Sequence, residues 1–147
     1  MERQDIVEKV RAFNRFYLPA LNLLGNHYLG SEFGVTYARI FYEIYCREGC
    51  NAAYLAKSMN IDKGYVSRIL ASHEQHGFLT RVASETDRRS QKLYLTDEGK
   101  RRAEDFILKS NRDIGGHLEG LSDRDLQQLG EAMDTIIRLL KKGESAT

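Results

Sequence analysis

The sequence predicts a mainly helical fold that carries one small β-hairpin. Apolar residues recur at steps of three and four along most of the 147 residues, which is the spacing of one helical face. One proline, twelve glycines and no tryptophan agree with a helical chain that has few rigid loops. Two short β-type runs, 79–83 and 92–95, interrupt this pattern and flank the polar stretch 84–91.

Two helices are predicted before the centre of the chain. The first covers 6–24, where the apolar residues form a single stripe. Pro19 lies inside it and is expected to kink it, because proline lacks an N–H and its ring clashes with the previous turn. Gly25 should end this helix. The second is expected over 36–47, with Thr36 as its N-cap.

Two short helices joined by a tight turn should follow. Asn51 is a suitable N-cap for a helix over 52–59, and Asp62 is one for a helix that runs to His76. Gly77 is the expected C-terminal stop of the second of these. With the hairpin after them, these helices have the order of a winged helix-turn-helix, which we place at 35–96.

Two longer helices are predicted at the C-terminal end, over 96–118 and from the capping box at Ser122 to about residue 142. The last one carries apolar residues in a heptad pattern: Leu126, Leu129, Met133, Ile136 and Leu140. One small subunit cannot bury such a stripe alone. The segments 1–30 and 97–142 are therefore predicted to pair two copies of a single-domain chain.

The charge of the chain is nearly balanced, with a formal net charge of +1. This total argues against a surface coated in positive charge for nucleic acid. From Asn51 to Leu95, however, seven lysines and arginines face four acidic residues, which gives +3 there and −2 elsewhere. The distribution indicates a small basic surface within an acidic frame.

Several classes of protein are excluded by what the sequence lacks. No apolar run approaches the about 18 residues of a membrane span, and the first residues do not resemble a signal peptide. Two cysteines cannot form a disulfide framework, so we expect a cytoplasmic protein. We find neither a catalytic motif nor compact metal-ligand spacing, and we expect no enzyme activity, no cofactor and no metal.

The second helix of a helix-turn-helix enters the DNA major groove, and its first turns contact the bases. The candidate contact residues there are Lys63, Gly64, Tyr65, Ser67 and Arg68. Arg68 is suited to a bidentate contact with guanine. On the wing the candidates are Arg88, Arg89 and Lys92, because arginine at a wing tip fits the electronegative minor groove. Asp87 is expected to orient an arginine.

Several segments resemble the MarR family of regulators. Those similar to its DNA-binding core are Leu55–Met59, Asp62–Leu70 and Glu74–Leu79, and those similar to its wing and next helix are Asp87–Ser90 and Leu93–Gly99. The stretch Tyr28–Ser31, with Ala38-Arg39 and Tyr42-Glu43 behind it, is most similar to the MarR-type half of fusions with N-acetyltransferases. We expect no acetyltransferase here.

The resemblance implies a homodimeric transcription regulator, most often a repressor, that binds a pseudo-palindromic operator. It also implies release from DNA by a small phenolic or lipophilic effector. The aromatic residues expected near such a pocket are Phe13, Tyr17, Tyr28, Phe41 and Tyr45. Two alternatives are a winged-helix module that binds protein, and a thiol-redox regulator that uses Cys46 and Cys50.

Overall fold

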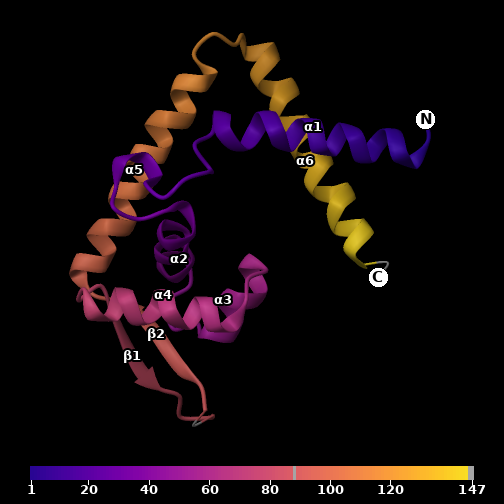
Figure 1. Cartoon of the computed structure of the whole chain (residues 1–147). Coiled ribbons are helices and arrows are strands. Elements are labelled where there is room, and N and C mark those ends of the chain that lie inside the picture. The colour runs from indigo at the N-terminus through magenta and orange to yellow at the C-terminus, as the bar shows by residue number, and fades with distance from the viewer. Residues whose placement is uncertain (88, 146–147) are drawn as a thin grey trace. The chain divides into compact units, whose positions relative to one another are not determined.

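The structure is a computed structural model that describes residues 1–87 and 89–145, and it is helical apart from one hairpin (Figure 1). Its elements in order are α1 (Arg3–Ala20), η1 (Tyr28–Gly30), α2 (Val35–Cys46), α3 (Ala52–Met59), α4 (Lys63–Gln75), β1 (Leu79–Ala83), β2 (Gln91–Leu95), α5 (Asp97–Leu118) and α6 (Asp123–Ser145). Two compact units are present, 1–111 and 112–147. The predicted fold class, mainly helical with a two-stranded wing, is confirmed.

The predicted helix caps of the central segment are confirmed. The Asn51 side-chain oxygen accepts a hydrogen bond from the Tyr54 amide at 2.8 Å and so begins α3. The Asp62 carboxylate accepts from the amides of Gly64 and Tyr65 at 3.0 and 3.3 Å and so begins α4. These short polar side chains bond amides that have no partner inside the helix, which is why the helices start where the sequence predicts.

The predicted end of the first helix is wrong. α1 ends at Ala20 rather than Leu24, so Pro19 lies in its last turn instead of kinking its middle. Asn22 adopts a left-handed backbone conformation (φ 57°), and the Leu23 amide bonds the Leu18 carbonyl at 2.9 Å. Asparagine tolerates this conformation, so it closes the helix in the way predicted for Gly25.

The start of α2 also differs from the prediction. Its N-cap is Gly34, in an extended conformation, and not Thr36. The Gly34 carbonyl accepts the first helical hydrogen bond, from the Ala38 amide at 3.2 Å. A backbone carbonyl begins this helix without any capping side chain, which explains why residue preference pointed to the nearby threonine.

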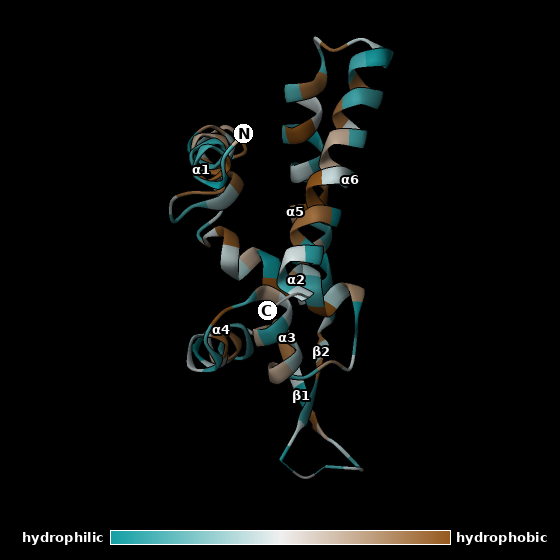
Figure 2. Ribbon diagram, turned by 90° about the vertical axis from the view of Figure 1, so that its right-hand side faces the viewer, coloured by the Kyte–Doolittle hydropathy of each residue, from teal (hydrophilic) through white to brown (hydrophobic). Residues whose placement is uncertain are grey.

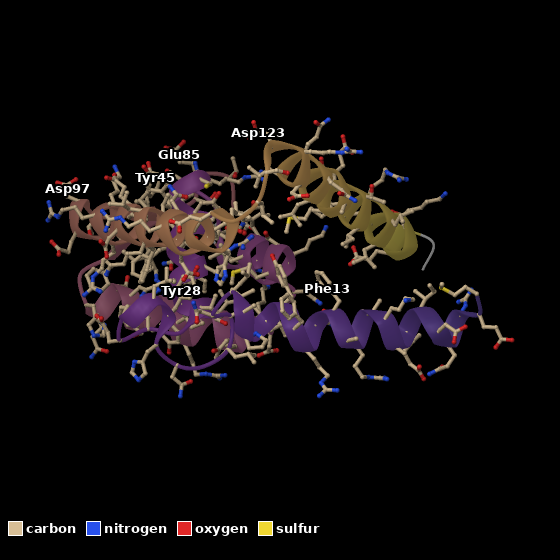
Figure 3. The ribbon with its side chains drawn as sticks, turned by 90° about the horizontal axis from the view of Figure 1, so that it is seen from above. Phe13, Tyr28, Tyr45, Glu85, Asp97 and Asp123 are labelled. Atoms are coloured by element: carbon tan, nitrogen blue, oxygen red, sulfur yellow. The ribbon has the colours of Figure 1, made fainter. Side chains whose placement is uncertain are left out.

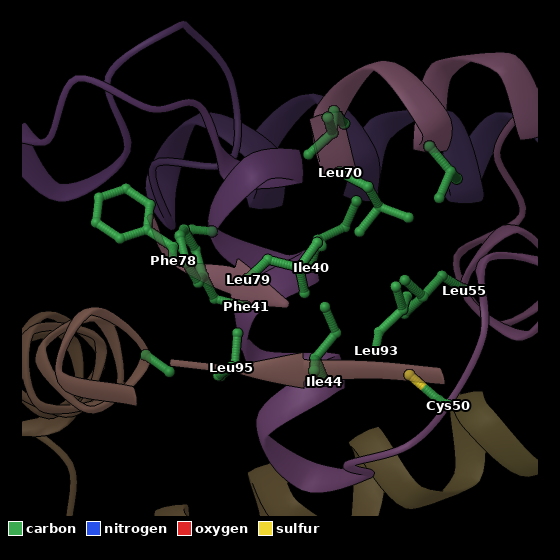
Figure 4. Close-up of a cluster of buried hydrophobic side chains, with 14 of the residues drawn as sticks. Ile40, Phe41, Ile44, Cys50, Leu55, Leu70, Phe78, Leu79, Leu93 and Leu95 are labelled. Atoms are coloured by element: carbon green, nitrogen blue, oxygen red, sulfur yellow. The ribbon is translucent and has the colours of Figure 1, made fainter. Parts of the chain in front are cut away.

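The core of the first unit lies between α2, α3, α4 and the hairpin (Figure 4). Its fully buried members include Ile40, Phe41, Ile44, Leu55, Val66, Ile69 and Leu70. The strands pair antiparallel with Leu79 opposite Leu95. The Gly49 amide bonds the Leu93 carbonyl and the Leu93 amide bonds the Cys50 carbonyl, at 2.9 and 2.8 Å. The approach to α3 is thereby joined to β2.

The helix α4, the β1–β2 hairpin and α5 meet at Phe78. The Phe78 amide bonds the His73 carbonyl at 2.9 Å, with Gly77 left-handed (φ 79°), which ends α4 as predicted. The Phe78 carbonyl accepts from the Thr96 amide at 3.0 Å. A Cβ on Gly99 would lie only 2.1 Å from this carbonyl oxygen. We call this set of contacts the Phe78 junction.

Replacing Gly99 with alanine should therefore force α5 away from the Phe78 junction. We expect G99A to lower the free energy of unfolding by about 1–3 kcal/mol or more, because the opposing atom belongs to the backbone. Urea unfolding measures the change. In the same helix nothing lies within 4 Å of a Cβ built on Gly115. The control G115A should gain up to about 1 kcal/mol from helix propensity, and equal effects in both variants would contradict the proposed contact.

His73 is buried at the centre of an aromatic cluster. Its Nε2 lies 3.2 Å from the Tyr37 carbonyl, and its Nδ1 has no partner among the described residues. Its ring centroid lies 4.0 Å from that of Phe41 and 5.6 Å from that of Phe33. Burial lowers the pKa of His73 to about 4, although the hydrogen bond to Tyr37 acts in the opposite direction.

The fold should consequently lose stability in acid through His73. Between pH 6.5 and 4 the unfolded chain binds this proton and the folded chain does not. We expect this contribution to be absent above about pH 6.5 and to destabilise the fold by about 3 kcal/mol at pH 4, at 1.36 kcal/mol per pKa unit. Unfolding free energies of the original chain and H73Q should diverge by that amount on acidification. Parallel curves would contradict the assignment.

The terminal helices bury none of their own side chains. On α1 the apolar residues Ile6, Val10 and Phe13 are each exposed by more than 40%. Along α6 the heptad residues Ile136 and Leu140 are exposed as well. Brown and teal segments both occur along the α6 ribbon, which Figure 2 shows from the side. In the described part of the chain, no helix combines the length and the apolar character that crossing a bilayer requires.

Candidate nucleic-acid interface

The helix α4 has one buried and one exposed face. Val66, Ile69 and Leu70 face the core, and this fixes the direction in which the other side chains project. All five predicted contact residues are exposed: Lys63, Gly64, Tyr65, Ser67 and Arg68. The structure therefore brings them together on the free face of the first two turns. The Arg68 guanidinium lies 5.7 Å from the centre of the Tyr65 ring.

Gly64 has a role inside the protein as well as on this face. A Cβ at this position would lie 2.9 Å from the Asp62 carboxylate oxygen that caps the helix. The capping carboxylate thus folds over a position that has no side chain. This accounts for glycine here without any contact to DNA.

The wing is the β1–β2 hairpin, and its tip is held by hydrogen bonds. The Asp87 carboxylate accepts from the Arg89 amide at 2.9 Å, and the Asp87 carbonyl accepts from the Ser90 amide at 3.0 Å. Asp87 thus fixes the backbone of Arg89. Arg89 and Lys92 are exposed on the wing, whereas Arg88 lies outside the described residues.

A cleft of about 380 Å³ separates the wing from the starts of α3 and α4. The charged side chains that line it are Lys63, Arg81, Arg89 and Asp87. Three cations face one carboxylate, so the cleft is a positively charged surface between the two predicted DNA-contacting elements. We call it the wing cleft.

Two features of the wing cleft were missed at the level of sequence. Arg81 pairs with Leu93 across the hairpin and reaches Glu74 on α4, with 3.4 Å between Nε and the carboxylate. Asn51 donates from its amide nitrogen to the Ser90 hydroxyl at 3.1 Å. The alternation of side chains along β1 puts Arg81 on the same side as Leu79, opposite the buried Leu93, so the sequence could have indicated that Arg81 faces inward. No sequence pattern predicts the Asn51–Ser90 contact, which joins residues 39 positions apart.

The five aromatic residues predicted for an effector pocket do not gather at one place. Phe13 and Tyr17 stack on α1 with ring centroids 5.1 Å apart, and Phe41 is fully buried in the core. Phe13, Tyr28 and Tyr45 lie on separate segments (Figure 3). Of the five, Tyr28 lines a cavity of about 420 Å³, which we call the connector cavity.

The connector cavity lies between the segment after α1, the helix α2 and the middle of α5. Tyr28, Tyr42 and Phe106 give it aromatic walls, and Arg39 gives it a cation. The Arg39 Nε lies 2.7 Å from the Glu43 carboxylate, which is nearly buried. The cavity thus combines apolar surface with a guanidinium that is partly neutralised.

The two cysteines differ in environment. Cys46 is exposed, and its hydrogen bond with Tyr42 raises the pKa of that tyrosine. Cys50 is buried in the core, and burial raises the pKa of its thiol, which disfavours the reactive thiolate. Among the described residues, no group of three or more His, Cys, Asp and Glu side chains is placed to hold a metal ion.

Comparison with known proteins agrees with this geometry. Residues 35–91 match the MarR family. The organic hydroperoxide resistance transcriptional regulator of Bacillus subtilis (strain 168) is 34% identical over 90 residues, which cover 58% of this chain and 57% of that regulator. The chain therefore matches little more than half the length of that relative.

Two solved structures share the fold over nearly the whole chain. FabT of Streptococcus pneumoniae, in complex with DNA, has a TM-score of 0.71 at 20% identity, covering 96% of this chain and 99% of that one. A mutant MarR from E. coli, complexed with operator DNA, has a TM-score of 0.73 at 20% identity, covering 90% and 95%. None of these matches supports the finer resemblance to acetyltransferase fusions. The matched segment runs from α2 to the first residue of β2 and includes the exposed face of α4, so this part of the chain is similar to the MarR family and has the winged helix-turn-helix fold of the solved structures.

Proposed function

We propose that the chain acts as a homodimer that binds a pseudo-palindromic operator, places α4 in the major groove and places the wing in the adjacent minor groove. The single observation that carries this proposal is the shared exposure of Lys63, Tyr65 and Arg68 on the free face of α4 beside a basic wing. A major groove admits one helix and displays a distinct pattern for each base pair. Arg68 reads bases, and Arg89 inserts into the minor groove.

The dimer in this proposal is formed by the terminal segments 1–30 and 97–142. The exposed apolar stripes of α1 and α6 support it, because a second copy would remove them from water. Two-fold symmetry then sets the α4 helices of the two copies about 34 Å apart, which is one turn of DNA. FabT and the E. coli MarR were each solved with DNA, which supports the same use of the fold here.

Loss of either arginine should weaken DNA binding without unfolding the protein. We expect R68A and R89A each to reduce affinity about 5- to 150-fold for a duplex selected from a random library, corresponding to about 1–3 kcal/mol. R68A should also relax base preference at one position of each half-site. Fluorescence anisotropy at several salt concentrations measures both affinity and its salt dependence.

K109Q is the control for these variants, since Lys109 is a half-exposed cation on α5 that pairs with Asp105 and is remote in sequence from residues 63–68 and 87–92. Its affinity should match that of the original chain. Affinity should fall steeply as salt rises, because phosphate contacts release counterions. Unchanged affinity in both arginine variants would contradict the assignment of the interface. A chain that selects no duplex would favour the alternative, a winged helix that binds protein.

The regulation that we propose is repression relieved by a small phenolic or lipophilic effector in the connector cavity. Its aromatic walls suit a flat apolar body, and Arg39 suits a phenolate or carboxylate on that body. The effector would favour a dimer geometry in which the two recognition helices no longer match successive major grooves. A coupling of about 1–3 kcal/mol changes operator affinity about 5- to 150-fold.

Filling the connector cavity should abolish release but leave DNA binding intact. Ile107 lines the cavity, so I107W should bind the selected duplex normally and fail to release it in hydroxybenzoate. K109W, two residues away on the same helix and not in the lining, should release it like the original chain. If hydroxybenzoates release DNA equally from I107W and the original chain, the effector does not occupy this cavity.

A thiol-responsive regulator is the second candidate. The name of the B. subtilis relative, which refers to organic hydroperoxide resistance, favours it. In this chain the exposed thiol is Cys46, and the buried, high-pKa Cys50 is a poor partner for oxidation. The candidate therefore depends on Cys46.

A further inference from the structure

Among the described residues, the outer part of the wing has no buried apolar side chain. Val82 is 50% exposed, and Ala83, Gln91 and Lys92 are exposed as well. On β2 the first buried residue is Leu93. A two-stranded hairpin has little stability of its own. On its inner side the wing faces the open wing cleft instead of packing against another element. The direction of the tip must therefore be fixed by polar contacts.

Asn51 supplies such a contact while it caps α3. Its side-chain oxygen accepts from the Tyr54 amide at 2.8 Å, and its side-chain nitrogen donates to the Ser90 hydroxyl at 3.1 Å. Among hydrogen bonds and ion pairs between described residues, this is the one that joins the segment 84–90 to a residue outside the hairpin. The planar amide holds both contacts at once, because its donor and its acceptor point in different directions.

Ser90 passes this restraint to the tip. Its amide donates to the Asp87 carbonyl at 3.0 Å, and its carbonyl accepts from the Ser84 amide at 3.1 Å. The Asp87 carboxylate in turn holds the Arg89 amide at 2.9 Å. The restraint therefore runs from the start of α3 through Ser90 to the backbone of the exposed wing arginine.

We propose that Asn51 is a positioning residue for DNA recognition, which sets the direction of the wing through Ser90 and so presents Arg89 to the minor groove. The inference rests on the proposed function, since it assigns to Asn51 an effect on the same interface. The Asn51–Ser90 hydrogen bond orders the tip before DNA arrives, so that binding does not bear the full cost of ordering it. α3 packs on α4 through the common core, and the wing is thereby held relative to the recognition helix.

A double-mutant cycle tests the proposal on the full chain, with a duplex that the original chain selects from a random library. S90A removes the acceptor and leaves the cap of α3 intact. N51S keeps a capping oxygen but is too short to reach Ser90. We expect each to weaken binding about 2- to 12-fold, the effect of one net hydrogen bond, and the double variant to be no weaker than either single one. Both variants should still unfold cooperatively, with a thermal midpoint lowered by no more than the loss of one hydrogen bond explains.

Two comparisons show whether Asn51 acts through the wing arginine. In an R89A background, S90A should cause no further loss of affinity. T86A is the matched control and should bind like the original chain, because among the described residues the Thr86 hydroxyl has its hydrogen bond with Ser84, inside the tip. Without DNA, the amides of Arg89 and Gln91 should exchange faster with solvent in S90A and N51S than in T86A.

Three results would overturn the proposal. Unchanged affinity of N51S and S90A for a duplex that the original chain binds contradicts it and leaves the proposed function standing. Losses that add in the double variant, or that persist in the R89A background, contradict the route through Ser90. An original chain that selects no duplex overturns the proposed function and this inference together, even if the exchange rates of the tip change.

Discussion

The backbone carbonyl of Phe78 is the group on which the arrangement of α4, the wing and α5 depends. It accepts from the Thr96 amide and lies so close to Gly99 that only a residue without Cβ fits beside it. The Phe78 amide bonds the His73 carbonyl and so ends α4. The Thr96 hydroxyl adds a hydrogen bond to the Gly77 carbonyl at 2.7 Å. The helix α4, the wing and α5 are therefore joined by one set of backbone contacts, and the direction of each restricts the directions of the others.

The contacts that hold the elements change in kind from this point toward the surface that we propose for DNA. The inner face of α4 is fixed by side chains that are fully buried, whereas the described residues of the wing tip are exposed or half-buried and are held by hydrogen bonds. An effector in the connector cavity would act on α5, one of the elements joined at the Phe78 junction. Phe106 and Ile107 line that cavity on α5, the helix that begins at the Phe78 junction. A small displacement of α5 would thus change the direction of α4.

Sequence reasoning succeeded where local chemistry decides the structure. Asn51 and Asp62 begin helices through bonds to amides two or three residues away, and Gly77 ends one because it adopts a left-handed conformation. It failed where a backbone group or a distant partner decides. Gly34 caps α2 through its carbonyl, and Asn22 replaces the glycine expected to end α1. The same limit applies to the candidate site. The order of the elements predicted the contact residues of α4, but the Asn51–Ser90 contact spans 39 residues. An aromatic residue such as Phe41 can serve a core or a pocket, and the sequence does not distinguish the two.

The central claim is that this chain contacts DNA through the free face of α4 and the wing. The most direct test is the change of backbone amide resonances when a duplex selected by the chain is added at low salt. We predict the largest changes at residues 63–68 and 87–92, with small changes at the buried positions of α2. Changes concentrated on α1, α6 or the lining of the connector cavity, with residues 63–68 unaffected, would contradict the claim.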